Sequence, residues 1–203
     1  QYIGQANHSV TSGDVDGDGK DEVVLGSLVL NDDGTVLYST NLGHGDAMHL
    51  SDLDPTRPGL ELFSVKEDTN EPYQTVFTDA ASGNIVWAVF NGRDTGRGLA
   101  ADIDPNYAGN EAWGAANLNV WSAKGEVIGQ IRPATNFAIW WDGDSQRELL
   151  DDISVRKWDW TNQSEVVLLD ATGTASNNGT KATPCLQADL LGDWREEVVL
   201  RSI

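Results

Sequence analysis

The chain has 203 residues, of which 39% are hydrophobic and 22% are charged, and this composition excludes a disordered tail and allows one domain with a sizeable core. No apolar run reaches the roughly 20 residues that span a bilayer, which excludes a membrane-spanning segment. The formal net charge of −19 argues against nucleic acid as a partner, because phosphate binding requires clustered Lys and Arg.

One pattern recurs five times along the chain: an Asp pair or triad, then Gly or Pro, then a Glu that enters an apolar run. The five segments are 14–22, 52–61, 102–111, 142–148 and 189–197. Their starts are separated by roughly 40 to 50 residues, which is the length of a four-stranded propeller blade. The pattern therefore predicts an internal repeat that organises the whole chain.

The expected elements follow the same order in each repeat. A strand follows the Glu, at 22–26, 61–65, 111–114 and 197–200. A second strand, a glycine turn and a third strand come next, with the turns at 33–34, 82–83, 124–125 and 172–173. A fourth strand leads into the next Asp segment. No segment has a sustained 3.6-residue apolar period, so the chain is predicted to be all-β.

These elements predict that residues 1–203 form a single partial β-propeller domain, with blade repeats that start near 7, 45, 95, 135 and 182. The chain stops soon after the fifth Asp segment, so the fifth unit is incomplete. We therefore expect about four to five blades of a larger propeller. A small four-bladed propeller with overlapping ends is the alternative.

The Asp segments are candidate calcium loops. Calcium takes six to eight oxygen ligands, which alternate residues of a tight loop can supply, and a final carboxylate closes the shell. The single cysteine, Cys185, cannot form an internal disulfide, so the chain needs another stabilising cross-link, and several bound calcium ions would provide it. The candidate ligands are Asp14, Asp16, Asp18, the carbonyl of Lys20, and Glu22; Asp52, Asp54 and Glu61; Asp102, Asp104 and Glu111; Asp142, Asp144 and Glu148; and Asp189, Leu191 through its carbonyl, Asp193 and Glu197.

A second cluster is expected at the other end of the strands. Five polar residues lie five to eight positions before the Asp segments, where each innermost strand begins: His8, Asp46, Arg97, Asn136 and Lys181. Glu67 should return to the same face, because its strand runs antiparallel from Glu61. We expect a ring of His8, His44, Asp46, Glu67, Arg97 and Lys181, with a metal ion among the first four.

The structural alternative for this cluster is local. His44 and Asp46 would cap a turn in residues 43–46, and Arg97 would pair with Asp94. His49 is expected on the strand itself, as a residue of the core or of the blade edge.

Four motifs carry a resemblance to a known family: Gly-His-Gly-Asp-Ala-Met-His at 43–49, Gly-Arg-Asp-Thr-Gly-Arg-Gly at 92–98, Asn-Gly-Thr-Lys at 178–181 and Asp-Leu-Leu-Gly-Asp-Trp-Arg-Glu-Glu at 189–197. They resemble the rhamnogalacturonan lyases of polysaccharide lyase family 11. The resemblance implies an eight-bladed, calcium-rich propeller of a secreted bacterial enzyme that acts on the rhamnose–galacturonate backbone of pectin. It also implies substrate contacts at Asn178, Gly179, Thr180 and Lys181.

The expected reaction is β-elimination, in which a base removes the C5 proton of a galacturonate. Lys181 is the candidate base, because the positive charges of Ca²⁺ and Arg97 would favour its neutral amine. Arg97 is expected to bind the substrate carboxylate, since guanidinium barely deprotonates in proteins. The partner would be an acidic plant polysaccharide, bound by a monomer. The alternatives are a non-catalytic calcium-binding propeller for carbohydrate or protein adhesion, similar to the integrin repeats, and a glycosidase with a carboxylate pair.

Overall fold

Four four-stranded antiparallel sheets follow one another along the chain in the computed structural model, which describes residues 2–203. In each sheet the strands lie side by side in chain order. The sheets are β1 (Ala6–Gly13), β2 (Glu22–Gly26), β3 (Leu28–Leu30) and β4 (Val36–Ser39); β5 (Ala47–Ser51), β6 (Glu61–Val65), β7 (Thr75–Asp79) and β8 (Ile85–Val89); β9 (Gly98–Ala101), β10 (Glu111–Gly114), β11 (Val120–Trp121) and β12 (Val127–Gly129); and β13 (Phe137–Ile139), β14 (Glu148–Asp151), β15 (Ser154–Asp159) and β16 (Ser164–Asp170).

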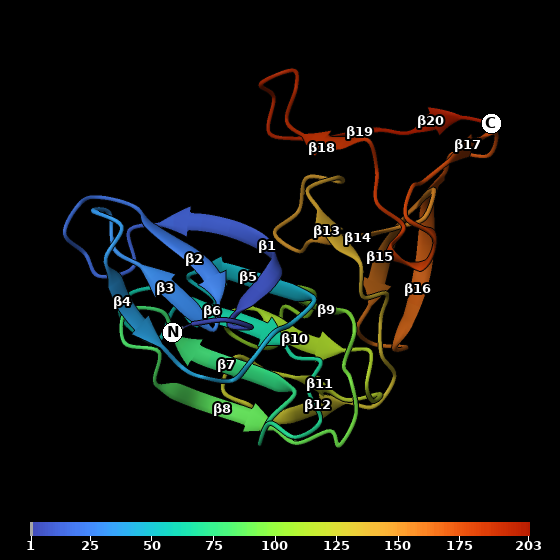
Figure 1. Cartoon of the computed structure of the whole chain (residues 1–203). Coiled ribbons are helices and arrows are strands. Elements are labelled where there is room, and N and C mark those ends of the chain that lie inside the picture. The colour runs from blue at the N-terminus through green and yellow to red at the C-terminus, as the bar shows by residue number, and fades with distance from the viewer. Residues whose placement is uncertain (1) are drawn as a thin grey trace.

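The first strands of successive sheets are neighbours. Strand β1 lies against β5, β5 against β9, and β9 against β13. Figure 1 shows the resulting succession from the blue first sheet through the teal-to-green second sheet and the yellow-green third sheet to the gold-to-orange fourth sheet. Consequently the residues at the starts of these four strands are gathered at one end of the molecule.

The core lies between the sheets rather than within one layer. Val24 and Val29 of the first sheet pack with Leu62 of the second, Phe63 and Phe77 of the second pack with Ala112 of the third, and Trp113 of the third packs with Leu149 of the fourth. A strand that is covered on both faces has no polar alternation, and every residue of β6 and β10 is buried. This burial explains the apolar runs that follow Glu61 and Glu111.

Aromatic side chains also join neighbouring sheets through their polar ends. Tyr38 Oη donates a hydrogen bond to the carbonyl of Ala80 (2.8 Å), and Trp87 Nε1 donates to the carbonyl of Ala123 (2.8 Å). The Trp87 ring stacks on Phe77, with ring centroids 5.2 Å apart, and lies 5.9 Å from the ring of Trp121. Each of these aromatics thus fixes one sheet against the next.

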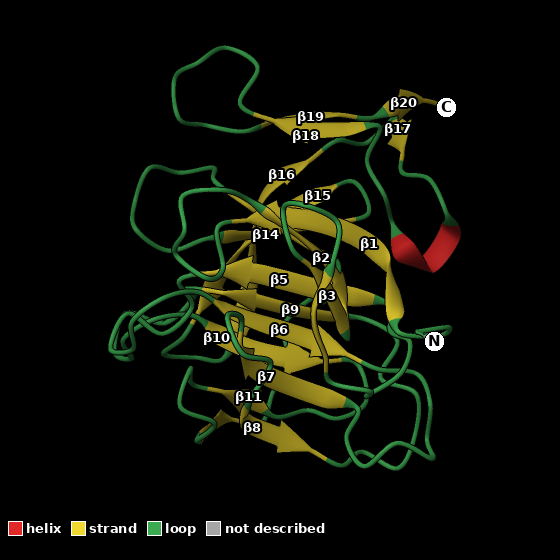
Figure 2. Cartoon of the chain, turned by 60° about the vertical axis from the view of Figure 1, so that its left-hand side comes forward, coloured by secondary structure: helices red, strands yellow, loops and turns green. Residues whose placement is uncertain are grey.

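The C-terminal part of the chain forms two short ribbons instead of a fifth four-stranded sheet. Strand β17 (Thr174–Ala175) pairs with β20 (Arg201–Ser202), and β18 (Leu186–Ala188) pairs with β19 (Glu197–Val199). In Figure 1 these ribbons extend away from the four sheets, and Figure 2 shows the 3-10 helix η1 (Gly179–Lys181) as the red segment before them. That helix is one turn long, and none within residues 2–203 is long and apolar enough to cross a membrane.

The structure confirms the all-β prediction and three of the four hairpin turns. Gly34, Gly83 and Gly125 take positive φ angles between the third and fourth strands of their sheets. The prediction of a hairpin at Thr172–Gly173 is wrong, because these residues come after β16 and lead into β17. The turn of the fourth sheet lies at 160–163, where Asp159 Oδ1 accepts hydrogen bonds from the amides of Thr161 and Asn162.

Candidate functional site

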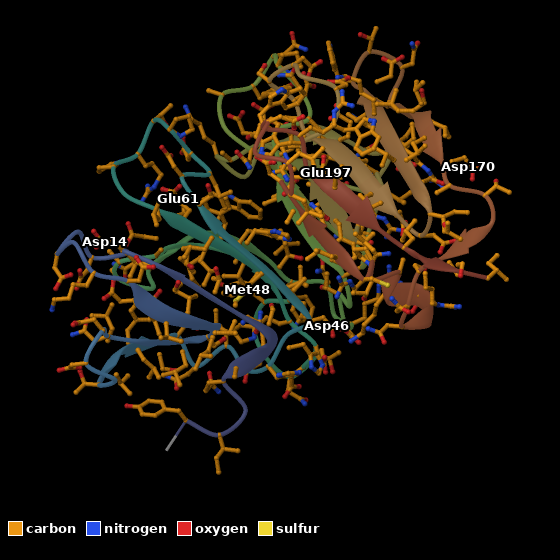
Figure 3. All side chains as sticks on the ribbon, turned by 90° about the horizontal axis from the view of Figure 1, so that it is seen from above. Asp14, Asp46, Met48, Glu61, Asp170 and Glu197 are labelled. Carbon is orange, nitrogen blue, oxygen red and sulfur yellow. The ribbon has the colours of Figure 1, made fainter. Side chains whose placement is uncertain are left out.

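The predicted site residues fall into two sets at opposite ends of the strands. In Figure 3, Asp14 and Glu61 lie at one end, and Asp46 lies at the other. The register of β5 and β6 has the same consequence, since Ser51 pairs with Glu61 and Ala47 pairs with Val65. The Asp loops and the His-containing cluster are therefore separate sites.

The Glu of each repeat fastens its Asp loop to the strand that follows. Glu61 Oε2 accepts hydrogen bonds from the amides of Leu53 and Asp54 (both 3.0 Å), and Glu111 Oε2 accepts from those of Ile103 and Asp104 (both 2.9 Å). Similar bonds are made by Glu22, Glu148 and Glu197. The second oxygens of Glu22, Glu61 and Glu111 are buried without a hydrogen-bond partner. A buried carboxylate oxygen of this kind fits a cation ligand.

The first loop brings three carboxylates together. Oxygen atoms of Asp14, Asp16 and Asp18 lie within 4.8 Å of one another. The loop is closed by its own backbone, because the two oxygens of Asp14 accept hydrogen bonds from the amides of Gly17 (2.8 Å) and Gly19 (3.0 Å). This arrangement, with the buried Glu22 beneath it, fits a calcium ion.

The loops at 52–61, 102–111 and 189–197 differ from this expectation. No group of three carboxylates converges in them within residues 2–203. The carboxylate of the second Asp is engaged within the loop instead. Asp54 Oδ1 accepts hydrogen bonds from the backbone amide and the hydroxyl of Thr56, and Asp104 Oδ1 accepts from the backbone and side-chain amides of Asn106. In the last loop Asp189 accepts from the amides of Gly192, Asp193 and Trp194. The ligands predicted in these three loops are therefore not brought together as a group of three carboxylates within residues 2–203, and calcium binding there stays a prediction.

The fourth loop contains a cation of its own. Lys157 Nζ, from β15, contacts Asp142, Asp144 (2.5 Å) and Glu148 (3.1 Å), three acids that lie within 4.8 Å of one another. Burial lowers the pKa of Lys157, but its hydrogen bonds with Asp142, Asp144 and Glu148 outweigh burial and raise the pKa above the ordinary value. The Lys157 ammonium group lies where the predicted calcium ion would be, so this loop does not fit a calcium site at Asp142, Asp144 and Glu148.

The second set contains the His-containing cluster. His8 lies in β1, His44 and Asp46 immediately precede β5, and Glu67 follows β6. His8 Nε2 lies 3.3 Å from His44 Nε2, 3.5 Å from Asp46 Oδ1 and 3.6 Å from Glu67 Oε1. His44 Nε2 is 3.4 Å from the same Glu67 oxygen. Ligand atoms of His8, His44 and Glu67 thus lie within 4.8 Å of one another, and Asp46 contacts this group through His8.

These contacts fit a shared metal ion. Atoms that bind one ion at 2.0 to 2.6 Å lie roughly 3 to 4 Å from each other, as they do here. His44 Nδ1 contacts the carbonyl of Ala6, which can only accept, so the proton of a neutral ring is on Nδ1. The lone pair on Nε2 then faces the Glu67 carboxylate, and a cation between them would make both contacts favourable.

Two cations border the same cluster. Lys181, in η1, places Nζ 3.4 Å from Asp46 Oδ1. Arg97 Nε donates to Asn136 Oδ1 (3.1 Å), and Asn136 Nδ2 donates in turn to the carbonyl of Thr180 (3.2 Å). A cleft of about 440 Å³ is lined by His8, Asp46, Arg97, Asn136, Asn178 and Lys181, among others. The cleft therefore joins the His-containing cluster to the two cations and to Asn178.

The local alternatives for the cluster are not what the structure shows. Asp94 Oδ1 accepts from the amide of Gly96 (2.7 Å), and Arg97 bonds Asn136 instead. His49 lies on β5, as expected, with Nε2 3.1 Å from the carbonyl of Gly98, and burial lowers its pKa to about 4. His49 is consequently a neutral packing residue.

The sequence analysis placed Asn136 at a strand start but left it out of the ring, and it assigned neither Lys66 nor Lys157 to either set. Asn136 stands at the same repeat position as Arg97, and that spacing was the signal for it. No sequence pattern marks Lys66. In the structure its side chain is 1% exposed, and burial lowers its pKa to about 7. Lys157 reaches its loop across β14 and β15, a contact that depends on strand register.

Fold and site together define a repeat-built, all-β protein with a His and carboxylate cluster of metal-binding type beside a cationic cleft. Comparison with known proteins gives the family. The family model for "Rhamnogalacturonan lyase family 11, C-terminal domain" matches residues 1–203. The chain belongs to this family, which confirms the resemblance seen in the four motifs.

The similar proteins are lyases of Bacillus species. The chain is 58% identical to the rhamnogalacturonan endolyase YesW of Bacillus subtilis and 50% identical to the exolyase YesX of the same strain, over 99% of its length in both cases. It covers 32% and 36% of those relatives, so it spans about a third of their length. The structure of a Bacillus licheniformis rhamnogalacturonan lyase superposes with a TM-score of 0.96 at 58% identity, covering 99% of this chain and 34% of that one.

Proposed function

We propose that this chain is part of a calcium-dependent rhamnogalacturonan lyase that cleaves the rhamnose–galacturonate backbone of pectin by β-elimination. The observation that carries the proposal is the cleft shared by His8, Asp46, Arg97 and Lys181 in a member of this family. The names of the relatives, an endolyase and an exolyase of rhamnogalacturonan, support the same substrate.

The scaffold of this enzyme is proposed to be a β-propeller, eight-bladed when complete. The neighbouring first strands β1, β5, β9 and β13 support an arrangement of blades around one axis. The blades would start near 7, 45, 95 and 135, with β18 and β19 beginning a fifth near 182. Because the chain spans about a third of its relatives' length, the other blades would come from the rest of the protein.

Calcium is proposed at the Asp loops other than the fourth, where Lys157 takes the place of the ion, with Asp14, Asp16, Asp18, Glu22 and the carbonyl of Lys20 as the best-formed set. A further metal ion would be held by His8, His44, Asp46 and Glu67. Such an ion supplies positive charge beside the cleft, which stabilises the charge that develops on a galacturonate during elimination.

Each residue of the cleft has its own role in the proposed reaction. Arg97 binds the galacturonate carboxylate, and Asn178, Gly179 and Thr180 hold the sugar. Lys181 takes the C5 proton, the electron pair of the C5–H bond forms the C4–C5 double bond, the bond between C4 and O4 breaks, and the departing oxygen takes up a proton.

The same proposal places the enzyme outside a bacterial cell, where its polymeric substrate is found, as a secreted monomer. A chain with a net charge of −19 repels a polyuronate. The substrate can therefore bind only where Arg97, Lys181 and bound cations reverse the local field.

The test is an assay of the complete enzyme on rhamnogalacturonan, with and without Ca²⁺. Only elimination leaves an unsaturated uronide that absorbs ultraviolet light, so absorbance should rise in the presence of calcium and not on unbranched polygalacturonate. New reducing ends without absorbance would instead indicate a glycosidase. Binding without any cleavage would indicate the non-catalytic adhesion module.

A further inference from the structure

A buried lysine lies directly beneath the His-containing cluster. Lys66 follows β6, is 1% exposed, and makes no ion pair within residues 2–203. Its Nζ lies 2.8 Å from Ser27 Oγ, 3.3 Å from Asn7 Oδ1 and 3.5 Å from the carbonyl of Gly43. Ser27 Oγ donates in turn to the carbonyl of Gly43 (2.8 Å). Lys66 is thus surrounded by neutral acceptors from three separate segments of the chain.

Two of these acceptors, Asn7 and Gly43, and Lys66 itself each stand next to one of the four clustered residues. Asn7 precedes His8, Gly43 precedes His44, and Lys66 itself precedes Glu67. The fourth residue is reached as well, because Asn7 Nδ2 donates to the carbonyl of Ala47 (3.3 Å), which follows Asp46. The Lys66 side chain therefore contacts the residues that precede His8 and His44, reaches the residue after Asp46 through Asn7, and lies directly before Glu67.

Backbone hydrogen bonds between the same segments reinforce this network. The amide of His8 donates to the carbonyl of Gly45 (3.1 Å), and the amide of Glu67 donates to the carbonyl of His44 (3.2 Å). There is no room for a larger residue in this network, since a Cβ at Gly26 or Gly45 would collide with the Asn7 side chain. The segments consequently hold the cluster in one geometry.

A lysine is a costly residue at such a place. Burial of an amine among neutral groups loses hydration that the three hydrogen bonds only partly replace, and an apolar side chain of the same length would avoid that loss. A metal site, in contrast, needs its ligands held in place, and outer groups that orient them commonly change metal affinity by about 10 to 100-fold.

We propose that Lys66 is a positioning residue for the His8, His44, Asp46 and Glu67 site: it joins the three segments that carry these ligands and thereby sets the affinity of the site for its ion. This inference rests on the metal site of the proposed function. Lys66 itself does not touch the ion or the substrate.

The experiment measures calcium binding, not activity. The complete enzyme, stripped with a chelator, is titrated with Ca²⁺ by calorimetry, and the bound ions are counted by elemental analysis after dialysis. Glu67→Gln removes a ligand and should abolish one site. Lys66→Met should weaken that same site about 10 to 100-fold. The Asp14 loop is the internal control, and its affinity should stay unchanged.

Two outcomes separate this inference from the proposed function. If Glu67→Gln removes no ion, the metal site is absent and both proposals are wrong. If Glu67→Gln removes one ion but Lys66→Met leaves its affinity within about twofold, the positioning role alone is overturned. Should Lys66→Met fail to fold, Ser27→Ala removes one acceptor of Lys66 and should still weaken only the Glu67 site. Equal weakening of every calcium site by Ser27→Ala would show a general loss of stability and overturn the role.

Discussion

Lys181 and Arg97 reach the same cleft with different partners, which is why they are assigned different tasks. Lys181 Nζ faces Asp46 across 3.4 Å, whereas Arg97 is held by Asn136 and lies over the ring of Phe137. A held guanidinium suits the recognition of a planar carboxylate, and a lysine amine suits proton transfer.

Substitution of Lys181 by Ala in the complete enzyme should lower kcat by about 10² or more, with little change in KM, because positioned proton transfer contributes roughly 10² to 10⁴. Arg97→Ala should raise KM as well, since it removes ground-state binding of the carboxylate. Steady-state kinetics on rhamnogalacturonan measure both parameters, and Lys124→Ala on an exposed turn is the matched control. A Lys181→Ala variant that keeps more than about a tenth of the kcat would show that another group is the base.

Glu111 should make the folding stability of the chain depend on pH. Burial raises the pKa of Glu111 from 4.5 to about 8 in the absence of a cation, although two backbone amides act in the other direction. The folded chain then binds this proton more tightly than the unfolded chain. The resulting stabilisation is complete below about pH 4.5 and is lost as the pH rises through about 8.

Calcium binding at the loop of Glu111 should therefore release a proton at pH 7, because a carboxylate must be ionised to bind the ion. Titration calorimetry in buffers of different ionisation enthalpy measures that release. The variant Glu111→Gln should release about one proton fewer than the wild type when all sites are filled. Equal proton release from the two proteins would contradict the assignment of Glu111 as a ligand.

Among the elements, the fourth Asp loop differs from the first because a lysine on β15 reaches it. The first loop leaves its three Asp side chains facing one another, while the fourth has the Lys157 ammonium among its three acids. We therefore expect this loop to be independent of added calcium.

Replacement of Lys157 by Met should create a calcium site. The variant loses the ammonium but keeps Asp142, Asp144 and Glu148, so elemental analysis after dialysis in calcium should show one additional ion per chain. The charge-preserving variant Lys157→Arg should show no gain. If Asp144→Asn in the otherwise wild-type enzyme lowers the number of bound ions, the loop binds calcium in spite of Lys157 and this interpretation is wrong.

The sequence predicted the strands better than it predicted the contacts between them. The apolar runs after Glu61 and Glu111 predicted buried strands because β6 and β10 are covered on both faces, whereas β2, after Glu22, leaves Val23 37% exposed. The turn at 160–163 was missed because it contains no glycine. Gln163 takes the positive φ angle, 48°, that a glycine takes in the other three turns. Lys157 and Lys66 were beyond prediction, because their partners are set by strand register and by the packing of one sheet on the next.

For the candidate site, repeat position was a sufficient guide to His8, Asp46 and Arg97. Each stands at the start of a first strand, and the first strands of the four sheets are neighbours. The same reasoning placed Lys181 at a strand start, but it lies in the 3-10 helix η1, before β18. Its contact with Asp46 depends on the path of the C-terminal segment, which no repeat pattern encodes.

For the whole molecule, calcium is expected to contribute to folding stability. Ions bound only to the native state add RT ln(1 + [L]/Kd) each, which is about 2.7 kcal/mol when the free concentration is 100 times Kd. Chelation should therefore lower the melting temperature of the complete enzyme by many degrees, as measured by calorimetry. A melting curve that does not move, after elemental analysis has shown the sites to be empty, would contradict this expectation.

The aromatic contacts between sheets also have an optical consequence. The indole of Trp87 is hydrogen-bonded to the third sheet and lies 5.9 Å from Trp121, so the two chromophores belong to different sheets and are close enough to couple. Any change in the spacing of the second and third sheets alters that coupling directly. The contribution of this tryptophan pair to the near-ultraviolet circular dichroism should therefore report how tightly the second and third sheets pack, without an added label.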